Sequence, residues 1–486
     1  MPTTPESLPL LPGFAADRTL FVSTSGSAGP ALEVSHAAFL AQAAALAATL
    51  PPAPYLVNLC NDRYAFSLAF AAGLMRGAVS LFPPNRLAAT VEDIARDYPG
   101  ARCITDTPIP DLQLPTLDLE AALPMLPAEL VAARPERDAP AMPMLPAGQE
   151  SFIAFTSGST GRPRPHPKHW GDLVGCARAA ARRFGFGPAH GIVATVPPQH
   201  MYGLELSILV PFVTGARVAT ARPFFPADIR AALALMSPPR VLVTTPVHLR
   251  ACVETGLHWP DVALVISATA PLPLDLAEHI EAAWSTRVCE VYGSTETGSI
   301  ASRATCRDPL WRWYDGVRPA GDGDAVHISA DFVHGSVPVA DVLEHEPGGG
   351  FRLLGRAADM VKVGGKRASL AELNLKLNAV DGVRDGVFVA PDADEHQVAR
   401  LAAVVVAPGL DRQAIIAALA GRIDPAFYPR KVVLVERLPR NEAGKVTRAA
   451  LLELLADAGA SRTGEAPQVS APQPDRPADG ETHDAH

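Results

Sequence analysis

A segment rich in hydroxyl groups and glycine is the first part of this chain whose side chains could do chemistry. Phe152 to Phe155 form an apolar run that predicts a short buried strand. The run leads into hydroxyls and glycines whose O–H and backbone N–H groups could wrap an anion: Thr156, Ser157, Gly158, Ser159, Thr160 and Gly161. Positive charge follows at Arg162, Arg164 and Lys168, without the Gly-Lys-Ser/Thr ending of a Walker loop. The segment therefore predicts a phosphate-binding loop rather than a flexible linker.

A second chemical segment runs from Val291 to Gly298. A predicted strand ends there in an aromatic residue, Tyr292, whose ring can stack on a purine. Gly293 and a hydroxyl at Thr295 come next, followed by one carboxylate, Glu296. A carboxylate that faces phosphates is repelled unless a cation lies between them, so Glu296 is a candidate ligand of Mg²⁺.

A third segment, Leu438 to Arg448, places Lys445 directly after a glycine in the sequence Pro-Arg-Asn-Glu-Ala-Gly-Lys. Most lysines are solvated surface residues. On a loop of a mobile domain, however, a lysine can be inserted into a closed site and withdrawn again, and this context favours that interpretation.

Together and in this order, these segments resemble the motifs of the adenylate-forming superfamily, which includes acyl- and aryl-CoA synthetases, acyl-ACP ligases, peptide-synthetase adenylation domains and luciferases. The resemblance covers about residues 20–455. It implies ATP and Mg²⁺ as cofactors, and Thr156, Glu296 and Lys445 as catalytic residues. The chain departs from the family's motifs at two positions. Arg164 stands where a lysine is usual, and Ala358 stands where one of two aspartates is frequent.

The resemblance also implies roles for other residues. Tyr292 would stack on adenine, Thr295 would touch the α-phosphate, and Lys445 would bridge the substrate carboxylate and the α-phosphate side of ATP. Asp341 and Arg356 would reach the ribose, with Glu344 and Glu346 as less favoured alignments for the aspartate. His200 would border the carboxylate pocket, with the small-residue turn at Ser267, Ala268 and Thr269 packed against adenine and the acyl group. Asp359 matches the hinge about which the small domain rotates. Gly364 and Gly365 match the segment that lines the tunnel for the thiol after that rotation.

The implied reaction is ATP-dependent activation of a carboxylic acid to an acyl-adenylate. The acyl group would then pass to the thiol of CoA or of a phosphopantetheinylated carrier protein. Three local sequences are similar to ligases of bacterial aryl-polyene and xanthomonadin pigment clusters, which implies a hydroxybenzoate-type acid: Arg63-Tyr-Ala-Phe-Ser, Gly365-Lys-Arg-Ala-Ser-Leu and Phe427-Tyr-Pro-Arg-Lys. A fatty-acid ligase, a non-catalytic nucleotide-binding relative and a luciferase-like oxygenase are the alternatives.

Short apolar strands alternate with helical stretches through most of the chain, which predicts an α/β layered fold. A glycine-rich break near 348–350 precedes a shorter α/β pattern. We predict a large N-terminal domain over 1–355, a small mobile domain over 356–456 that carries Lys445, and a disordered tail over 457–486. A hydroxyl–glycine cluster at 23–29 lacks following cations and is interpreted as a turn. The proline-rich stretch 107–150 is interpreted as a surface connection.

The composition of the chain limits which binding partners and which cellular compartment are expected. The net charge of −9 provides no basic footprint for nucleic acid. The six cysteines contain no C-x-x-C pair, which argues against a disulfide framework or a zinc site and fits a reducing cytosol. We find no signal-peptide pattern at the N-terminus and no apolar run long enough to span a membrane. A cytoplasmic location is therefore expected.

Overall fold

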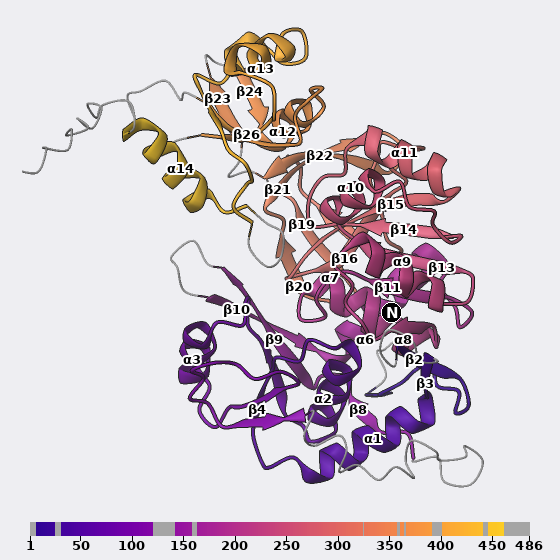
Figure 1. The fold of residues 1–486 in the computed structure, drawn as a ribbon. Coiled ribbons are helices and arrows are strands. Elements are labelled where there is room, and N and C mark those ends of the chain that lie inside the picture. The colour runs from indigo at the N-terminus through magenta and orange to yellow at the C-terminus, as the bar shows by residue number, and fades with distance from the viewer. Residues whose placement is uncertain are drawn as a thin grey trace, which may run out of the picture.

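A computed structural model describes residues 6–24, 31–119, 141–157, 163–323, 325–356, 360–363, 366–390, 401–440 and 446–460. In these residues a large layered body carries a smaller α/β unit at one end (Figure 1). The predicted α/β fold class is confirmed, and the strands predicted at the start of the phosphate loop and between 191 and 292 are all present.

The larger sheet of the body has nine strands within the described residues, and its central strands are parallel. Parallel central strands place all their carboxyl ends at one edge, where ligands bind in such sheets. In spatial order the strands are β17 (Arg312–Trp313), β16 (Gly298–Arg303), β15 (Arg287–Ser294), β14 (Leu264–Ser267), β13 (Arg240–Thr244), β11 (Gly191–Ala194), β12 (Arg217–Ala219), β2 (Thr19–Thr24) and β3 (Ala31–Ser35).

The second sheet of the body contributes the strand that enters the phosphate loop. It is parallel except where β10 folds back on β9 as an antiparallel hairpin. In spatial order its strands are β10 (Pro163–His169), β9 (Glu150–Ser157), β5 (Val79–Phe82), β4 (Tyr55–Asn58), β6 (Arg102–Thr105) and β7 (Thr116–Asp118). Short strands β1 (Ser7–Pro9) and β8 (Met144–Pro146) pair with each other.

Helices fill the space between the two sheets and cover their outer faces. The inner layer buries the main apolar core and consists of α1 (His36–Thr49), α2 (Arg63–Met75), α6 (Trp170–Phe184), α7 (Met201–Leu204), η3 (Glu205–Leu209) and α8 (Val210–Thr214). The outer face of the larger sheet packs on α9 (Pro226–Leu235), α10 (Pro246–Glu254) and α11 (Leu274–Trp284), and that of the smaller sheet on α3 (Ala88–Asp97).

The helix predicted after Ser35 begins where the sequence indicates. Ser35 caps α1, since its Oγ accepts from the Ala38 N–H at 3.2 Å. Helix α6 was not among the predicted elements. Its apolar residues lie on one buried face, and Gly185 ends it in the left-handed conformation.

Two antiparallel units complete the body. They are the sheet of β18 (Arg318–Ala320), β19 (His327–Ala330) and β20 (Val333–Pro338), and the hairpin of β21 (Asp341–Glu346) and β22 (Gly350–Arg356). The glycine-rich break near 348–350 is the turn of this hairpin, where Gly348 and Gly349 have positive φ angles.

The small unit has its own core on both faces of a sheet. Its elements are β23 (Met360–Val363), β24 (Lys366–Ser369), α12 (Leu370–Asn378), β25 (Asp385–Val389), β26 (Ala402–Val406), α13 (Arg412–Leu419), η5 (Pro425–Phe427), β27 (Lys431–Leu434) and α14 (Arg448–Ala460). The predicted tail began at 457, but α14 continues to Ala460 and Leu455 packs in the core. Residues 461–486 lie outside the described residues.

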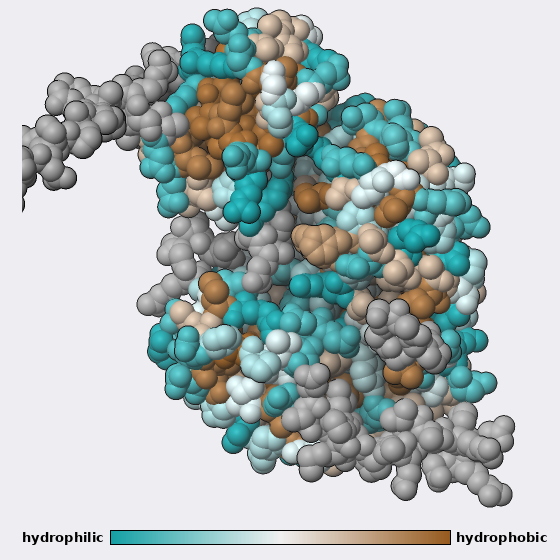
Figure 2. All heavy atoms as spheres, in the orientation of Figure 1, coloured by the Kyte–Doolittle hydropathy of each residue, from teal (hydrophilic) through white to brown (hydrophobic). Residues whose placement is uncertain are grey.

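Several other predictions can be placed. The connection over 107–150 includes strands β7 and β8, while 120–140 lies outside the described residues, as does 25–29 of the hydroxyl–glycine cluster. All six cysteines are free, and five are buried. Figure 2 shows hydrophilic residues over much of the visible face. No helix in the described part of the chain is long and apolar enough to cross a membrane.

Candidate active site

The predicted phosphate loop joins β9 to β10. Thr156 lies opposite Arg164 in the hairpin, and Ser157 lies opposite Pro163. Four residues of the predicted loop, Gly158, Ser159, Thr160 and Gly161, lie outside the described residues. The structure therefore places the two stems of the loop, with the Thr156 hydroxyl in the first of them.

The stem of the loop meets the turn that carries Glu296. His166 on β10 connects them, because its Nε2 lies 3.0 Å from the Thr156 Oγ1 and 3.5 Å from a carboxylate oxygen of Glu296. Lys168, two residues further along the same strand, donates from its Nζ to the backbone carbonyl of Glu296. Thr156 and Glu296, 140 positions apart in the sequence, are thus held around one imidazole.

The charge state of this group follows from burial and from its neighbours. Burial lowers the pKa of His166, and Arg164 and Lys168 act in the same direction against Glu296. Burial also lowers the pKa of Lys168. Burial alone would raise the pKa of Glu296, but hydrogen bonds and the two basic neighbours outweigh it and lower that pKa. Glu296 is therefore an ionised carboxylate at neutral pH.

The turn between β15 and β16 is built for a tight backbone. A Cβ added to Gly293 would lie 2.1 Å from the carbonyl oxygen of Gly298, so no other residue fits without moving the strands. In the turn that carries Glu296, the Ser294 N–H donates to the Thr297 Oγ1 at 3.1 Å, and the Thr297 N–H donates back to the Ser294 Oγ at 3.3 Å. These contacts fix the turn that presents Thr295 and Glu296.

Tyr292 and Asp341 are brought together at the same edge of the sheet. The Tyr292 hydroxyl donates to an Asp341 carboxylate oxygen at 2.7 Å, and the tyrosine ring packs against Trp311 and Phe351 with centroid distances of 5.7 Å. Asp341 pairs with Arg356 across the β21–β22 hairpin, although the Arg356 side chain lies outside the description. The contact with Tyr292 favours Asp341 as the ribose residue.

The two alternative carboxylates differ from Asp341 in their surroundings. Glu344 is exposed, and Glu346 forms an ion pair of 2.6 Å with Arg352. Asp341 therefore remains the favoured residue.

The predicted acid-binding residues lie at the carboxyl ends of neighbouring strands. Ser267 ends β14 opposite Thr244 of β13, and its buried Oγ has no hydrogen-bond partner. The following turn holds Thr269 at a φ of +78°, which is unusual for a β-branched residue and marks a constrained turn. His200 is the N-cap residue of α7, half-buried in the same region of the fold.

Three of the predicted roles fall on residues outside the described part of the chain. They belong to Lys445, to the hinge residue Asp359 and to the pair Gly364 and Gly365. The roles of these residues stay predictions from the sequence.

Sequence reasoning missed two side chains at the acid-binding end. The Tyr202 hydroxyl donates to the carbonyls of Thr244 at 3.1 Å and Ile266 at 2.9 Å, which joins α7 to β13 and β14. His248 Nδ1 lies 2.8 Å from the Thr245 Oγ1, and burial lowers the pKa of His248 to about 4. The buried Nε2 of His248 has no hydrogen-bond partner. Tyr202 directly follows Pro-Gln-His-Met and His248 lies two residues after Thr-Thr-Pro, both just beyond strand ends, and this position was the available signal.

His166 was also missed, and it carries a testable role. We expect His166→Ala to lower acid-dependent ATP–pyrophosphate exchange about tenfold, the equivalent of one hydrogen bond of about 1.4 kcal/mol, because Thr156 loses its partner. His166→Gln should retain most activity, since its amide can donate to the same Oγ1. Exchange rates of both variants, with melting temperatures as a check on folding, test this. Wild-type exchange in His166→Ala would rule the role out.

Comparison with known proteins identifies similar sequences and folds. Residues 34–321 match the family described as AMP-binding enzyme, and residues 376–445 match the AMP-binding enzyme C-terminal domain. A 4-coumarate–CoA ligase of Rhodobacter capsulatus is 31% identical over 60% of this chain and 73% of its own length. An anthranilate–CoA ligase of Pseudomonas aeruginosa is 25% identical over 85% and 90%. The O-succinylbenzoate CoA synthetase of Bacillus subtilis in complex with AMP has a similar fold, with a TM-score of 0.74, 16% identity and coverage of 91% and 98%.

Proposed function

Because this chain belongs to the AMP-binding enzyme family and is an AMP-forming acid–CoA ligase, we propose that its substrate is a hydroxylated aryl acid. The observation that carries the proposal is the pair of buried, unpartnered polar atoms at the acid-binding end, the Ser267 Oγ and the His248 Nε2. Buried polar groups without partners destabilise a protein, and a bound ligand that offers hydrogen bonds removes that cost.

The first half-reaction requires positioning rather than a general base. The carboxylate of the acid is already ionised at neutral pH, and its oxygen attacks the α-phosphorus of ATP while the bond to the pyrophosphate oxygen breaks. We propose that Thr156 and the phosphate loop bind the phosphates, that Tyr292 and Asp341 bind the nucleoside, and that Lys445 bridges the two anions. Catalysis depends mainly on stabilising the negative charge that develops on the leaving pyrophosphate.

Glu296 fits the chemistry of a magnesium site. Its carboxylate is ionised and 39% exposed, and hard oxygen ligands of this kind are those that Mg²⁺ prefers. Mg²⁺ bound there would neutralise phosphate charge. Glu296 itself is held by Lys168 on its backbone and lies beside His166, so the chain fixes where that charge is placed.

In the second half-reaction the sulfur of a thiol attacks the acyl carbon of the adenylate. The thiol proton is lost, the bond to AMP breaks, and a thioester is formed. CoA is the acyl acceptor. We further propose a carrier-protein thiol as an acceptor and a role in a pigment cluster. The resemblances of five or six residues that begin at Arg63, Gly365 and Phe427 support that role.

The acid itself is proposed from chemistry and from relatives. Two of the matched relatives are ligases of 4-coumarate and of anthranilate, which are aryl acids with a polar ring substituent. A fatty acid offers no polar group to the Ser267 hydroxyl or to the His248 nitrogen, whereas a ring hydroxyl can form a hydrogen bond with either. A hydroxybenzoate or hydroxycinnamate therefore suits this end of the site better than an alkyl chain.

The test is acid-dependent ATP–pyrophosphate exchange with benzoate, hydroxybenzoates, cinnamates and fatty acids. We expect the highest kcat/KM for a hydroxylated aryl acid, and a fall of about 10- to 100-fold in exchange for Lys445→Ala, since one charged contact to the transition state is lost. Equal rates for benzoate and its hydroxylated forms would contradict the specificity. Preference for a fatty acid would favour the alternative ligase, and ATP binding without any exchange would favour a non-catalytic relative.

A further inference from the structure

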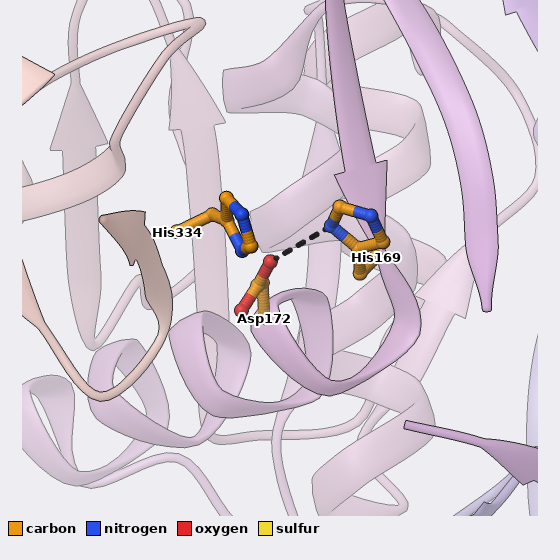
Figure 3. A group of neighbouring side chains, drawn as sticks. All are labelled: His169, Asp172 and His334. Carbon is orange, nitrogen blue, oxygen red and sulfur yellow. Dashed lines mark ion pairs between the residues drawn. The ribbon is translucent and has the colours of Figure 1, made fainter. Parts of the chain in front are cut away.

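Two histidines and one aspartate converge away from the phosphate loop. His169 ends β10, Asp172 lies in the first turn of α6, and His334 lies on β20 (Figure 3). One ligand atom from each residue lies within 4.8 Å of the other two. Figure 3 shows the Asp172 carboxylate between the two imidazole rings.

We propose that His169, Asp172 and His334 form a binding site for Zn²⁺. Two imidazole nitrogens and one carboxylate oxygen form a donor set typical of zinc, with a fourth position left for water. The scattered cysteines argued against a zinc site, but this cluster contains none of them. It also shares no residue with the candidate active site.

The contact between His169 and Asp172 leaves a buried nitrogen that a cation could satisfy. The His169 Nδ1 faces an Asp172 oxygen at 3.4 Å, yet this buried nitrogen makes no hydrogen bond. An unprotonated imidazole nitrogen and a carboxylate oxygen each offer a lone pair, so a metal ion between them would satisfy both. The His334 ring lies 5.2 Å from the His169 ring and is tilted by 38°, so the imidazoles are not stacked face to face.

The surrounding backbone holds the ligands in place. The register between β9 and β10 shifts between Lys168 and His169, and such an irregularity re-aims a side chain. Helix α6 packs closely on the segment before β20, because a Cβ added to Gly175 would lie 2.7 Å from the Phe332 Cβ. Asp172 and His334 therefore come from elements in fixed contact.

Only a small movement is needed to form the complete site. Ligand atoms of a tetrahedral zinc ion with bonds of about 2.0–2.1 Å lie about 3.4 Å apart, which is the separation of His169 and Asp172. His334 is exposed and can turn inward, and it also provides the path by which the ion enters from solvent. Bound zinc would tie β20 to the junction of β10 and α6.

The test uses the full-length protein without an affinity tag, freed of metal by chelation. Titration calorimetry with ZnCl₂ and the visible absorption spectrum with Co²⁺ are recorded for wild type, His334→Ala, Asp172→Asn and His327→Ala. His327 is an exposed histidine on the neighbouring strand β19, so its variant is a matched control. Tail histidines such as His483 remain in every variant, so their contribution to binding is common to all.

We expect one zinc per chain, a tetrahedral Co²⁺ spectrum and a raised melting temperature in wild type and in His327→Ala. His334→Ala and Asp172→Asn should bind at least about tenfold more weakly, since even groups that only orient ligands contribute that much. Zinc binding that is equal in wild type and His334→Ala, or absent in wild type, would overturn the proposal. Because His334 is exposed, its variant should fold normally, and its melting temperature without metal checks this.

Discussion

Glu296→Gln is expected to lower acid-dependent ATP–pyrophosphate exchange by about 100- to 1000-fold. Glutamine keeps the shape of the side chain but not its charge, and charge is what a carboxylate contributes to a metal ion among phosphates. Glu296 is ionised in the folded protein because hydrogen bonds together with His166 and Lys168 outweigh the effect of burial on its pKa. The backbone carbonyl still accepts from Lys168 in the variant, so the turn should stay in place.

Glu344→Gln is the matched control for this prediction. Glu344 is an exposed carboxylate on β21, and it was also the alternative candidate for ribose binding. We expect exchange in Glu344→Gln to stay within about twofold of wild type, as for a surface substitution. Exchange is measured against Mg²⁺ concentration for both variants. A Glu296→Gln enzyme with the wild-type rate and the wild-type Mg²⁺ dependence would show that this carboxylate does not bind the metal.

The parts of the site that the sequence predicted are those encoded by local pattern. A hydroxyl–glycine run after an apolar strand located Thr156, and a strand that ends in an aromatic, glycine and carboxylate located Tyr292 and Glu296. The rule that ligands bind at the carboxyl ends of parallel strands explains why such segments meet. Ser35 capped α1 as expected, because capping depends only on neighbouring residues.

The residues that were missed act through contacts across the fold. His166 has meaning only because β10 folds back on β9 and lies near the β15–β16 turn, and no local pattern encodes that distance. His169 and His334 are 165 positions apart, so their proximity depends on how α6 packs beside β20. Helix α6 was not predicted, although its apolar residues are spaced to form one buried face.

Arg63 makes hydrogen bonds to residues far away in the sequence, and these bonds can stabilise the fold. It begins α2, is fully buried, and joins the inner helical layer to the larger sheet. Its guanidinium donates five hydrogen bonds of 2.9–3.2 Å, to the Ser207 Oγ and to the carbonyls of Ala194, Val196, Ala219 and Ala221. Burial lowers the pKa of Arg63 to about 10, so it is still a cation at neutral pH.

We expect Arg63→Met to reduce the free energy of unfolding by about 3–5 kcal/mol. Methionine fills much of the volume, but it cannot donate to the four carbonyls, which are left without that partner between the layers. Arg63→Lys should be intermediate, because an ammonium group has three donors and lacks the planar fork. Urea denaturation followed by tryptophan fluorescence measures the shift in midpoint for each variant.

Arg76→Met is the control, since Arg76 ends the same helix and is exposed, and it should change stability by no more than about 0.5 kcal/mol. Buried ionic groups can sometimes be replaced by apolar side chains without loss. An Arg63→Met protein as stable as wild type would therefore mean that the five hydrogen bonds only offset the cost of burying the cation. A large loss would instead mean that these hydrogen bonds stabilise the fold, including the segment through Val196 that leads to His200.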